Sequence, residues 1–206
     1  IEATPADFRL DYQDVLLPLG RGGGDRIHGW WIPRADPGAP ALLYLQGGGR
    51  NISKDAVHAN HFWHMGFSVF IVDYRGSGRS DGEVPAETTM YEDAQVAWDY
   101  LKTRQPDAMK RYIYGHSIGG AVAIDLAVRN PDAAGLIVES GFTSMSDLIK
   151  TGAFMRLLPV DLILTQRFDA TAKIGALGMP LLMFHGAEDA IVPPELGKRL
   201  YATAPQ

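Results

Sequence analysis

One five-residue motif in this sequence has the residue types and spacing of a serine nucleophile. Residues 115–119 read Gly-His-Ser-Ile-Gly, with one glycine two positions before Ser117 and another two positions after it. In such a G-x-S-x-G motif the serine occupies a sharp strand-to-helix turn, which exposes its hydroxyl at the positive end of the helix dipole. The motif therefore predicts that Ser117 is a nucleophile; the alternative is that this serine only caps the helix.

A second match to the motif lies at residues 78–82, which read Gly-Arg-Ser-Asp-Gly. The flanking sequence distinguishes the two matches. Ser117 follows an apolar run at 111–114 and precedes a helical pattern, whereas no helix start follows Ser80. We therefore interpret Ser80 as part of a solvated turn and keep Ser117 as the candidate.

Short apolar runs predict the strands that position Ser117. They cover residues 41–45, 67–73, 111–114, 135–139 and 181–185. Strands that are apolar on both faces belong in the middle of a parallel sheet covered by helices. Residues 8–19 and 26–33, on either side of a triple-glycine turn at 22–24, predict an additional antiparallel pair at the start of the chain.

Helical periodicity separates these runs. Apolar residues at three- and four-residue spacing predict helices over residues 54–65, 90–101, 118–126 and 195–203. Thr89 and Glu92 are placed to form a capping box for the second helix. The alternation of strands and helices predicts an α/β fold, doubly wound, with a mainly parallel sheet flanked by helices.

No repeat or linker divides the chain, so residues 1–206 are interpreted as a single domain. The stretch at 145–178 is too long for a simple crossover between strands. Its apolar clusters predict short helices that form a small lid-like insertion within the domain.

Composition excludes several other classes of protein. The 206 residues are 46% hydrophobic and 21% charged, as in ordinary globular domains. No apolar run approaches the ~18 residues of a membrane span, so membrane association would require a segment outside this chain. A net charge of −5 without a basic block argues against nucleic-acid binding. The absence of cysteine excludes disulfides and thiolate metal sites and leaves the cellular location open.

Two patterns suggest a cofactor and are rejected. His58, His61 and His64 share one side of a predicted helix, but the carboxylate of an H-E-x-x-H metal site is missing. Residues 76–81 resemble a dinucleotide-binding G-x-G-x-x-G motif, but Asp81 occupies the third glycine position. We therefore expect neither a metal nor an organic cofactor.

Five segments carry a resemblance to a known family. They are residues 43–49 (Leu-Tyr-Leu-Gln-Gly-Gly-Gly), 72–80 (Val-Asp-Tyr-Arg-Gly-Ser-Gly-Arg-Ser), 114–120 (Tyr-Gly-His-Ser-Ile-Gly-Gly), 139–144 (Glu-Ser-Gly-Phe-Thr-Ser) and 184–193 (Phe-His-Gly-Ala-Glu-Asp-Ala-Ile-Val-Pro). Together they make the chain, from about residue 41 to residue 193, resemble α/β-hydrolase-fold serine hydrolases. The likeness is to the compact branch that includes depalmitoylating thioesterases and serine aminopeptidase-like and lysophospholipase-like members. It implies cleavage of an ester, thioester or amide in a small-molecule or acylated substrate, through an acyl-enzyme on Ser117.

The resemblance also implies the remaining site residues. Asp189 matches the acid of the family's H-G-x-x-D-x-x-V-P pattern, with the adjacent Glu188 as its rival. Two backbone amides are expected to form the oxyanion hole: that of Ile118, directly after the nucleophile, and that of Gly48. Residues 46–48 read Gln-Gly-Gly where related sequences have His-Gly-Asn, which keeps the backbone donor but loses the histidine contact. The alternative is that these glycines only form a turn.

A histidine base is expected after the acid in this family, yet all six histidines precede Asp189. We expect the natural protein to continue past Gln206 and to contain there the last strand and the catalytic histidine. Without that strand, an apolar sheet edge would be uncovered. Two other functions stay open: a non-catalytic binding or signalling protein of the same fold, and a cofactor-free perhydrolase. Substrate and oligomeric state are undetermined.

Overall fold

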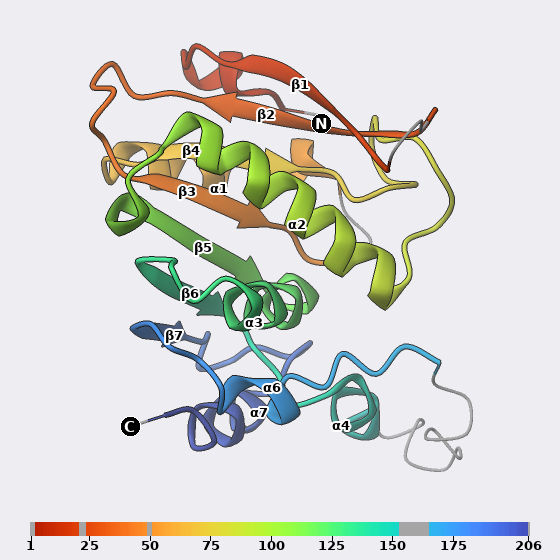
Figure 1. The fold of residues 1–206 in the computed structure, drawn as a ribbon. Helices are drawn as coiled ribbons and strands as arrows, with labels where there is room; N and C mark the ends of the chain where they lie inside the picture. The colour runs from red at the N-terminus through yellow and green to blue at the C-terminus, as the bar shows by residue number, and fades with distance from the viewer. Residues whose placement is uncertain (1–2, 21–23, 49–50, 153–164, 206) are drawn as a thin grey trace.

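The computed structural model describes residues 3–20, 24–48, 51–152 and 165–205. Within these residues, seven strands form one sheet in the order β1-β2-β4-β3-β5-β6-β7 (Figure 1). The strands are β1 (Gln13–Pro18), β2 (Arg26–Ile32), β3 (Ala41–Leu45), β4 (Ser68–Val72), β5 (Arg111–His116), β6 (Gly135–Glu139) and β7 (Leu181–Phe184). The β1–β2 and β2–β4 pairs are antiparallel and the other pairs are parallel, which confirms the predicted sheet.

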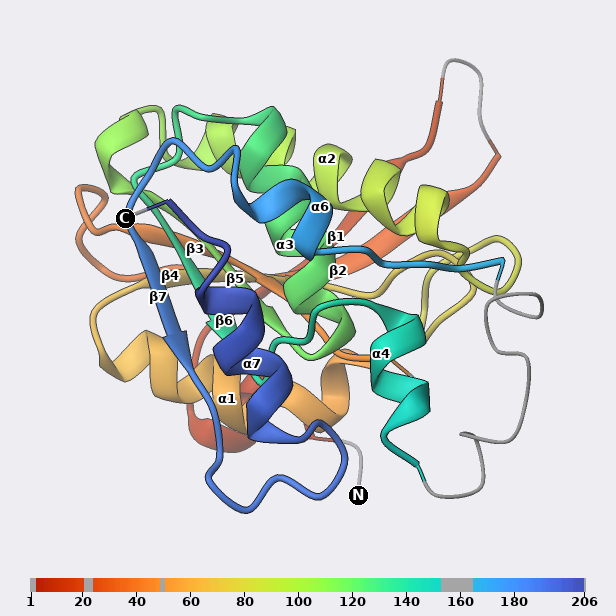
Figure 2. The ribbon, with the colours of Figure 1, turned by 90° about the horizontal axis from the view of Figure 1, so that it is seen from below.

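Helices cover both faces of the sheet. They are α1 (Ile52–His64), α2 (Glu87–Arg104), α3 (Ile118–Arg129), α4 (Met145–Lys150), α6 (Thr171–Ile174) and α7 (Pro194–Tyr201), with short 3-10 helices at Pro5–Phe8 and Ala108–Lys110. Helix α1 lies on one side of the sheet, and α2 and α3 lie on the other (Figure 2). The four helices predicted from periodicity are all present.

Alternating side chains of the central strands explain this arrangement. In β3, Leu43 and Leu45 pack with α2 and α3, whereas Leu42 and Tyr44 pack with α1, and all four are fully buried. Each buried leucine contributes roughly 1.5–3 kcal/mol to folding. The strand is therefore stabilised from both faces, as its apolar sequence predicts.

Two predictions near element boundaries are wrong. The strand predicted from residue 8 begins only at Gln13, because Phe8 ends a 3-10 helix over Pro5–Phe8. In that helix the Thr4 amide donates to the Asp7 carboxylate, and the next residue, Arg9, adopts a left-handed conformation with φ 59°. Helix α2 begins earlier than the predicted capping box allows. Thr89 lies inside its first turn and accepts a hydrogen bond from the Ala86 amide, whereas Glu92 pairs with an arginine.

The edge strand β7 differs from the other parallel strands. Its burial alternates along the strand, and Leu182 and Phe184 are 58% and 44% exposed. The middle of the predicted lid, residues 153–164, lies outside the described residues, which include its two flanks, 145–152 and 165–178. Among the helices that the structure describes, none combines the length and apolar character of a membrane span.

Candidate active site

Ser117 occupies the junction between β5 and α3. Its backbone has φ 54° and ψ −120°, a conformation that side-chain-bearing residues rarely adopt. The Ser117 amide donates to the Glu139 carbonyl at 2.9 Å, and the Ser117 carbonyl accepts from the Gly120 amide at 2.8 Å. These bonds to β6 and to the first turn of α3 hold the strained residue in place, so the strand–turn–helix predicted around it is present.

The glycines on either side of Ser117 make this turn possible. A Cβ atom built on Gly115 would lie 2.2 Å from the Gly119 carbonyl oxygen. A Cβ atom on Gly119 would lie 2.2 Å from the carbonyl oxygen of Leu45, at the end of β3. Both distances are far inside van der Waals contact with backbone atoms, so only glycine fits at either position.

The two candidate oxyanion donors lie against this turn. Ile118 is the first residue of α3, where an amide has no acceptor within its own helix. Gly48, in the loop after β3, is so close that a Cβ atom built on it would lie 3.4 Å from the Ile118 side chain. A Cβ atom on the preceding Gly47 would lie 3.6 Å from the Ser117 Cβ. The loop and the start of α3 are thus direct neighbours of the candidate nucleophile.

Asp189 lies in the loop after β7, with its carboxylate held at both oxygens. Oδ1 accepts from the Ile191 and Val192 amides, each at 2.9 Å, and Oδ2 accepts from the Ser140 hydroxyl at 2.9 Å. Partial burial raises the pKa of the carboxyl. The hydrogen bonds lower this pKa by more than burial raises it, and the bond from the Val192 amide contributes most to the lowering. The net pKa of Asp189 therefore lies below its ordinary value, and the group is ionised at neutral pH.

Strand β6 connects Ser117 with Asp189. Its last residue, Glu139, accepts the Ser117 amide through its carbonyl, and the next residue, Ser140, donates its hydroxyl to Asp189. The carboxyl ends of the parallel strands β5, β6 and β7 thus bring both predicted residues to the same end of the sheet. The rival acid, Glu188, is exposed.

Ser140 is a residue that sequence reasoning missed. It is 6% exposed, has a left-handed φ of 49°, and donates its amide to the Phe184 carbonyl at 3.1 Å. In the sequence, Ser140 stood out only as part of segment 139–144, one of the five segments that carry the family resemblance. No residue of that segment had been assigned a function.

Comparisons with known proteins show the family to which this chain belongs. A model of the serine aminopeptidase (S33) hydrolase family matches residues 39–167. The chain belongs to this family of α/β hydrolases. It is 31% identical to the α/β hydrolase domain-containing protein WAV2 of Arabidopsis thaliana, over 98% of this chain and 69% of that one. It is 33% identical to the lysophosphatidylserine lipase ABHD12 of Danio rerio, over 86% of this chain and 50% of that one.

Solved structures show the same fold. An α/β hydrolase from Vibrio vulnificus superposes with a TM-score of 0.76 at 25% identity, covering 93% of this chain and 69% of that chain. The Pyrococcus furiosus esterase PF2001 superposes with a TM-score of 0.74 at 19% identity, covering 97% and 79%. The predicted α/β-hydrolase fold is thereby confirmed.

Within this α/β hydrolase, His185 is the histidine that the described contacts place beside Asp189. Its Nε2 donates to the Val192 carbonyl at 2.7 Å and lies 3.7 Å from Asp189 Oδ2. The ring packs tightly on α7, because a Cβ atom built on Gly197 would lie 2.5 Å from its Nδ1. These contacts favour the interpretation of His185 as a structural residue.

The other histidines have different surroundings. Nδ1 of His116 lies against the loop after β3, 3.2 Å from where a Cβ atom on Gly47 would be. On α1, the His58 ring contacts the Tyr44 hydroxyl at 3.3 Å and lies 6.3 Å from the His61 ring. The described residues contain no group of three or more histidine, aspartate or glutamate side chains suited to a metal ion.

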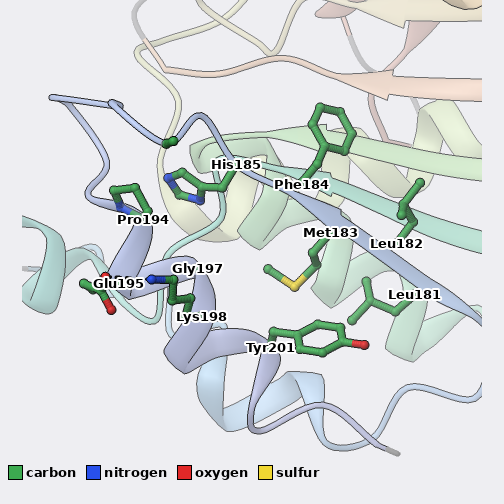
Figure 3. Close-up of a pocket in the computed structure, with 11 residues that line it drawn as sticks. Leu181, Leu182, Met183, Phe184, His185, Pro194, Glu195, Gly197, Lys198 and Tyr201 are labelled. Atoms are coloured by element: carbon green, nitrogen blue, oxygen red, sulfur yellow. Dashed lines mark hydrogen bonds and ion pairs between the residues drawn. The ribbon is translucent and has the colours of Figure 1, made fainter.

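A groove of about 610 Å³ runs between β7 and α7 on the outer side of the sheet. Figure 3 shows Leu182, Phe184 and Tyr201 around it, with His185 near one end. Its lining is mostly apolar and is supplied by the edge strand and α7, without Ser117 or Asp189.

Proposed function

We propose that this α/β hydrolase is a serine hydrolase that cleaves a carboxylic ester, thioester or amide through an acyl-enzyme on Ser117. The observation that carries the proposal is the Ser117 backbone, whose φ of 54° fits a nucleophile elbow between β5 and α3. Strain held in place at a non-glycine residue supports a role for its side chain.

In the proposed reaction, the Ser117 hydroxyl attacks the carbonyl carbon of the substrate while its proton passes to an imidazole base. The carbonyl oxygen becomes an oxyanion, which accepts hydrogen bonds from the Gly48 and Ile118 amides. The protonated base then donates to the leaving alcohol, thiol or amine, and the acyl-enzyme forms. Water repeats the attack with the same base and releases the carboxylic acid and free Ser117.

Asp189 orients the imidazole and stabilises its protonated form. Its depressed pKa supports this role, because the carboxylate is then ionised throughout the neutral range. His185 is committed to the Val192 carbonyl, so the proposal does not assign the base to it. The proposal therefore leaves the imidazole base, which the family supplies as the third member of a Ser-Asp-His order, unassigned among the described residues.

The name of one relative suggests a class of substrate to test. The Danio rerio relative is named as a lysophosphatidylserine lipase. We therefore include a lysophospholipid beside short p-nitrophenyl esters among the substrates to test.

The experiment is fluorophosphonate labelling of the full-length protein, with Ser117→Ala as the control. We expect one covalent adduct, located on Ser117 by mass spectrometry, and ester hydrolysis that falls at least ~10⁴-fold in the variant. A wild-type protein that neither labels nor hydrolyses any ester would contradict the proposal and favour the non-catalytic binding protein. Halogenation that depends on hydrogen peroxide would instead favour the perhydrolase.

A further inference from the structure

A fully buried carboxylate lies beneath the loop that carries Gly48. Asp73 directly follows β4 and is 1% exposed. Its Oδ1 accepts hydrogen bonds from Gln46 Nε2 at 3.1 Å and from the Ile52 amide at 2.9 Å. One oxygen atom thus joins the residue that follows β3 with the residue that begins α1.

The surroundings of Asp73 are shaped to keep it buried. Its Oδ2 accepts from the Arg79 amide at 3.4 Å and lies 3.5 Å from His28 Nδ1. A Cβ atom built on Gly78 would lie 2.1 Å from Oδ2, so glycine is required there. A buried carboxylate is costly to desolvate, and it is retained only where several donors surround it.

His28 extends this network toward the surface. It is 1% exposed, and its Nε2 contacts Asp14 Oδ1 at 2.6 Å. The same Asp14 oxygen accepts from Arg79 Nη1 at 2.8 Å. His28 in β2 and Arg79 in the loop after β4 therefore hold Asp73 in place. These contacts are separate from the hydrogen bonds that Asp73 accepts from Gln46 and Ile52.

The group that Asp73 holds is adjacent to the reacting serine. Gln46 is 1% exposed and immediately precedes Gly47 and Gly48, which lie against Ser117 and Ile118. Its carbonyl also accepts from the Tyr74 hydroxyl at 3.4 Å. A shift at Gln46 would therefore move the Gly48 amide relative to Ser117, and an error of about 1 Å in such a donor costs roughly 10²-fold in rate.

We propose that Asp73 is a positioning residue that, through Gln46 and Ile52, sets the Gly48 amide at the distance an oxyanion requires. The inference rests on the proposed hydrolase function. It assigns to Asp73 a role in the rate of the chemical step in addition to its part in the folded structure.

The test compares Asp73→Ala with wild type in the full-length protein, using p-nitrophenyl butyrate. The concentration of active sites is measured by complete fluorophosphonate labelling of Ser117, so that unfolded molecules do not lower the result. We expect kcat per labelled site to fall about 10- to 100-fold, with KM within about threefold of wild type. Asp73→Asn keeps one acceptor oxygen, and we expect it to restore part of the lost kcat.

A second pair of variants covers the case in which Asp73→Ala does not fold. Gln46→Met removes the donor to Asp73, and Gln105→Met is its matched control. Gln105 is also buried, and its side chain donates to the carbonyl of Ala39, two residues before β3 begins. Gln46 lies at the other end of this strand. We expect kcat per labelled site to fall about 5- to 20-fold in Gln46→Met and to stay within twofold in Gln105→Met.

Unchanged kcat per labelled site in Gln46→Met and in any folded Asp73 variant, with only a lower Tm, would overturn the positioning role and leave the hydrolase function intact. An equal loss of kcat in Gln105→Met would also overturn it, because the effect would then be general. Absence of labelling and turnover in the wild-type protein would contradict the hydrolase function itself and this inference with it.

Discussion

The Ser140 hydroxyl donates to Asp189 Oδ2 at 2.9 Å, which joins the loop after β6 to the loop after β7. The residue before Ser140 binds the Ser117 amide through its carbonyl. Two consecutive residues at the end of one strand therefore hold the candidate nucleophile and the candidate acid.

Removing the Ser140 hydroxyl should reduce the contribution of Asp189 to catalysis without abolishing it. In Ser140→Ala, Asp189 keeps the Ile191 and Val192 amides but loses a charge-assisted hydrogen bond, so we expect kcat/KM for a p-nitrophenyl ester to fall about tenfold. Ser144→Ala is the control, because the Ser144 hydroxyl accepts from the Asp147 amide and so caps α4. Equal kcat/KM values in wild type and Ser140→Ala would show that Asp189 does not depend on this contact.

The depressed pKa of Asp189 predicts how stability depends on pH. A carboxyl with a lower pKa in the folded state stabilises the fold fully above its unfolded pKa of about 3.9. That contribution is lost as the pH falls through the folded-state value. Urea unfolding between about pH 6 and pH 2 should therefore show a steeper acid decline in wild type than in Asp189→Asn. Parallel curves of unfolding free energy against pH for the two proteins would contradict the lowered pKa of Asp189.

His185 offers a direct test of the base. In His185→Gln, the side-chain amide can still donate to the Val192 carbonyl, so we expect kcat to stay within about threefold of wild type. The measurement is p-nitrophenyl ester hydrolysis per labelled Ser117. A loss of about 10³-fold or more with unchanged stability would instead identify His185 as the base.

Gly119 should tolerate no side chain. In Gly119→Ala the new methyl group would meet the Leu45 carbonyl oxygen at 2.2 Å, so β3 and α3 must separate. We expect a loss of about 1–3 kcal/mol or more in the free energy of unfolding, measured in urea. In the control Gly178→Ala the nearest atom lies at 3.7 Å, and we expect a change within about 0.5 kcal/mol.

Local sequence patterns predicted most of the architecture. The apolar runs predicted β3, β4, β5 and β6 because both faces of these strands are buried, and periodicity predicted α1, α2, α3 and α7. The prediction was wrong at Phe8 and at the start of α2, where hydrogen bonds of Asp7 and Thr89 decide the boundary. Such bonds depend on single side chains, to which an average over a window is insensitive.

Local patterns could predict the site only where its residues are close in sequence, whereas Asp189 and Gly48 were predicted through the family resemblance. Ser117 and its glycines form one motif, and their turn could be inferred from the strand and helix beside it. Ser140 and Asp73 could not, because their partners lie 49 and 27 residues away, at Asp189 and Gln46. Only the order of the strands in the sheet brings each pair together.

At the turn around Ser117, the backbone requires glycine at two positions but leaves the identity of the side chain between them open. At both Gly115 and Gly119 a Cβ atom would meet a backbone carbonyl oxygen at 2.2 Å, so any larger residue there has to displace a strand or a helix. Ser117 lies between them and differs from cysteine or aspartate by only a few atoms beyond Cβ. Another nucleophile, and with it another reaction, could therefore arise at this position by one substitution while every strand of the sheet keeps its place.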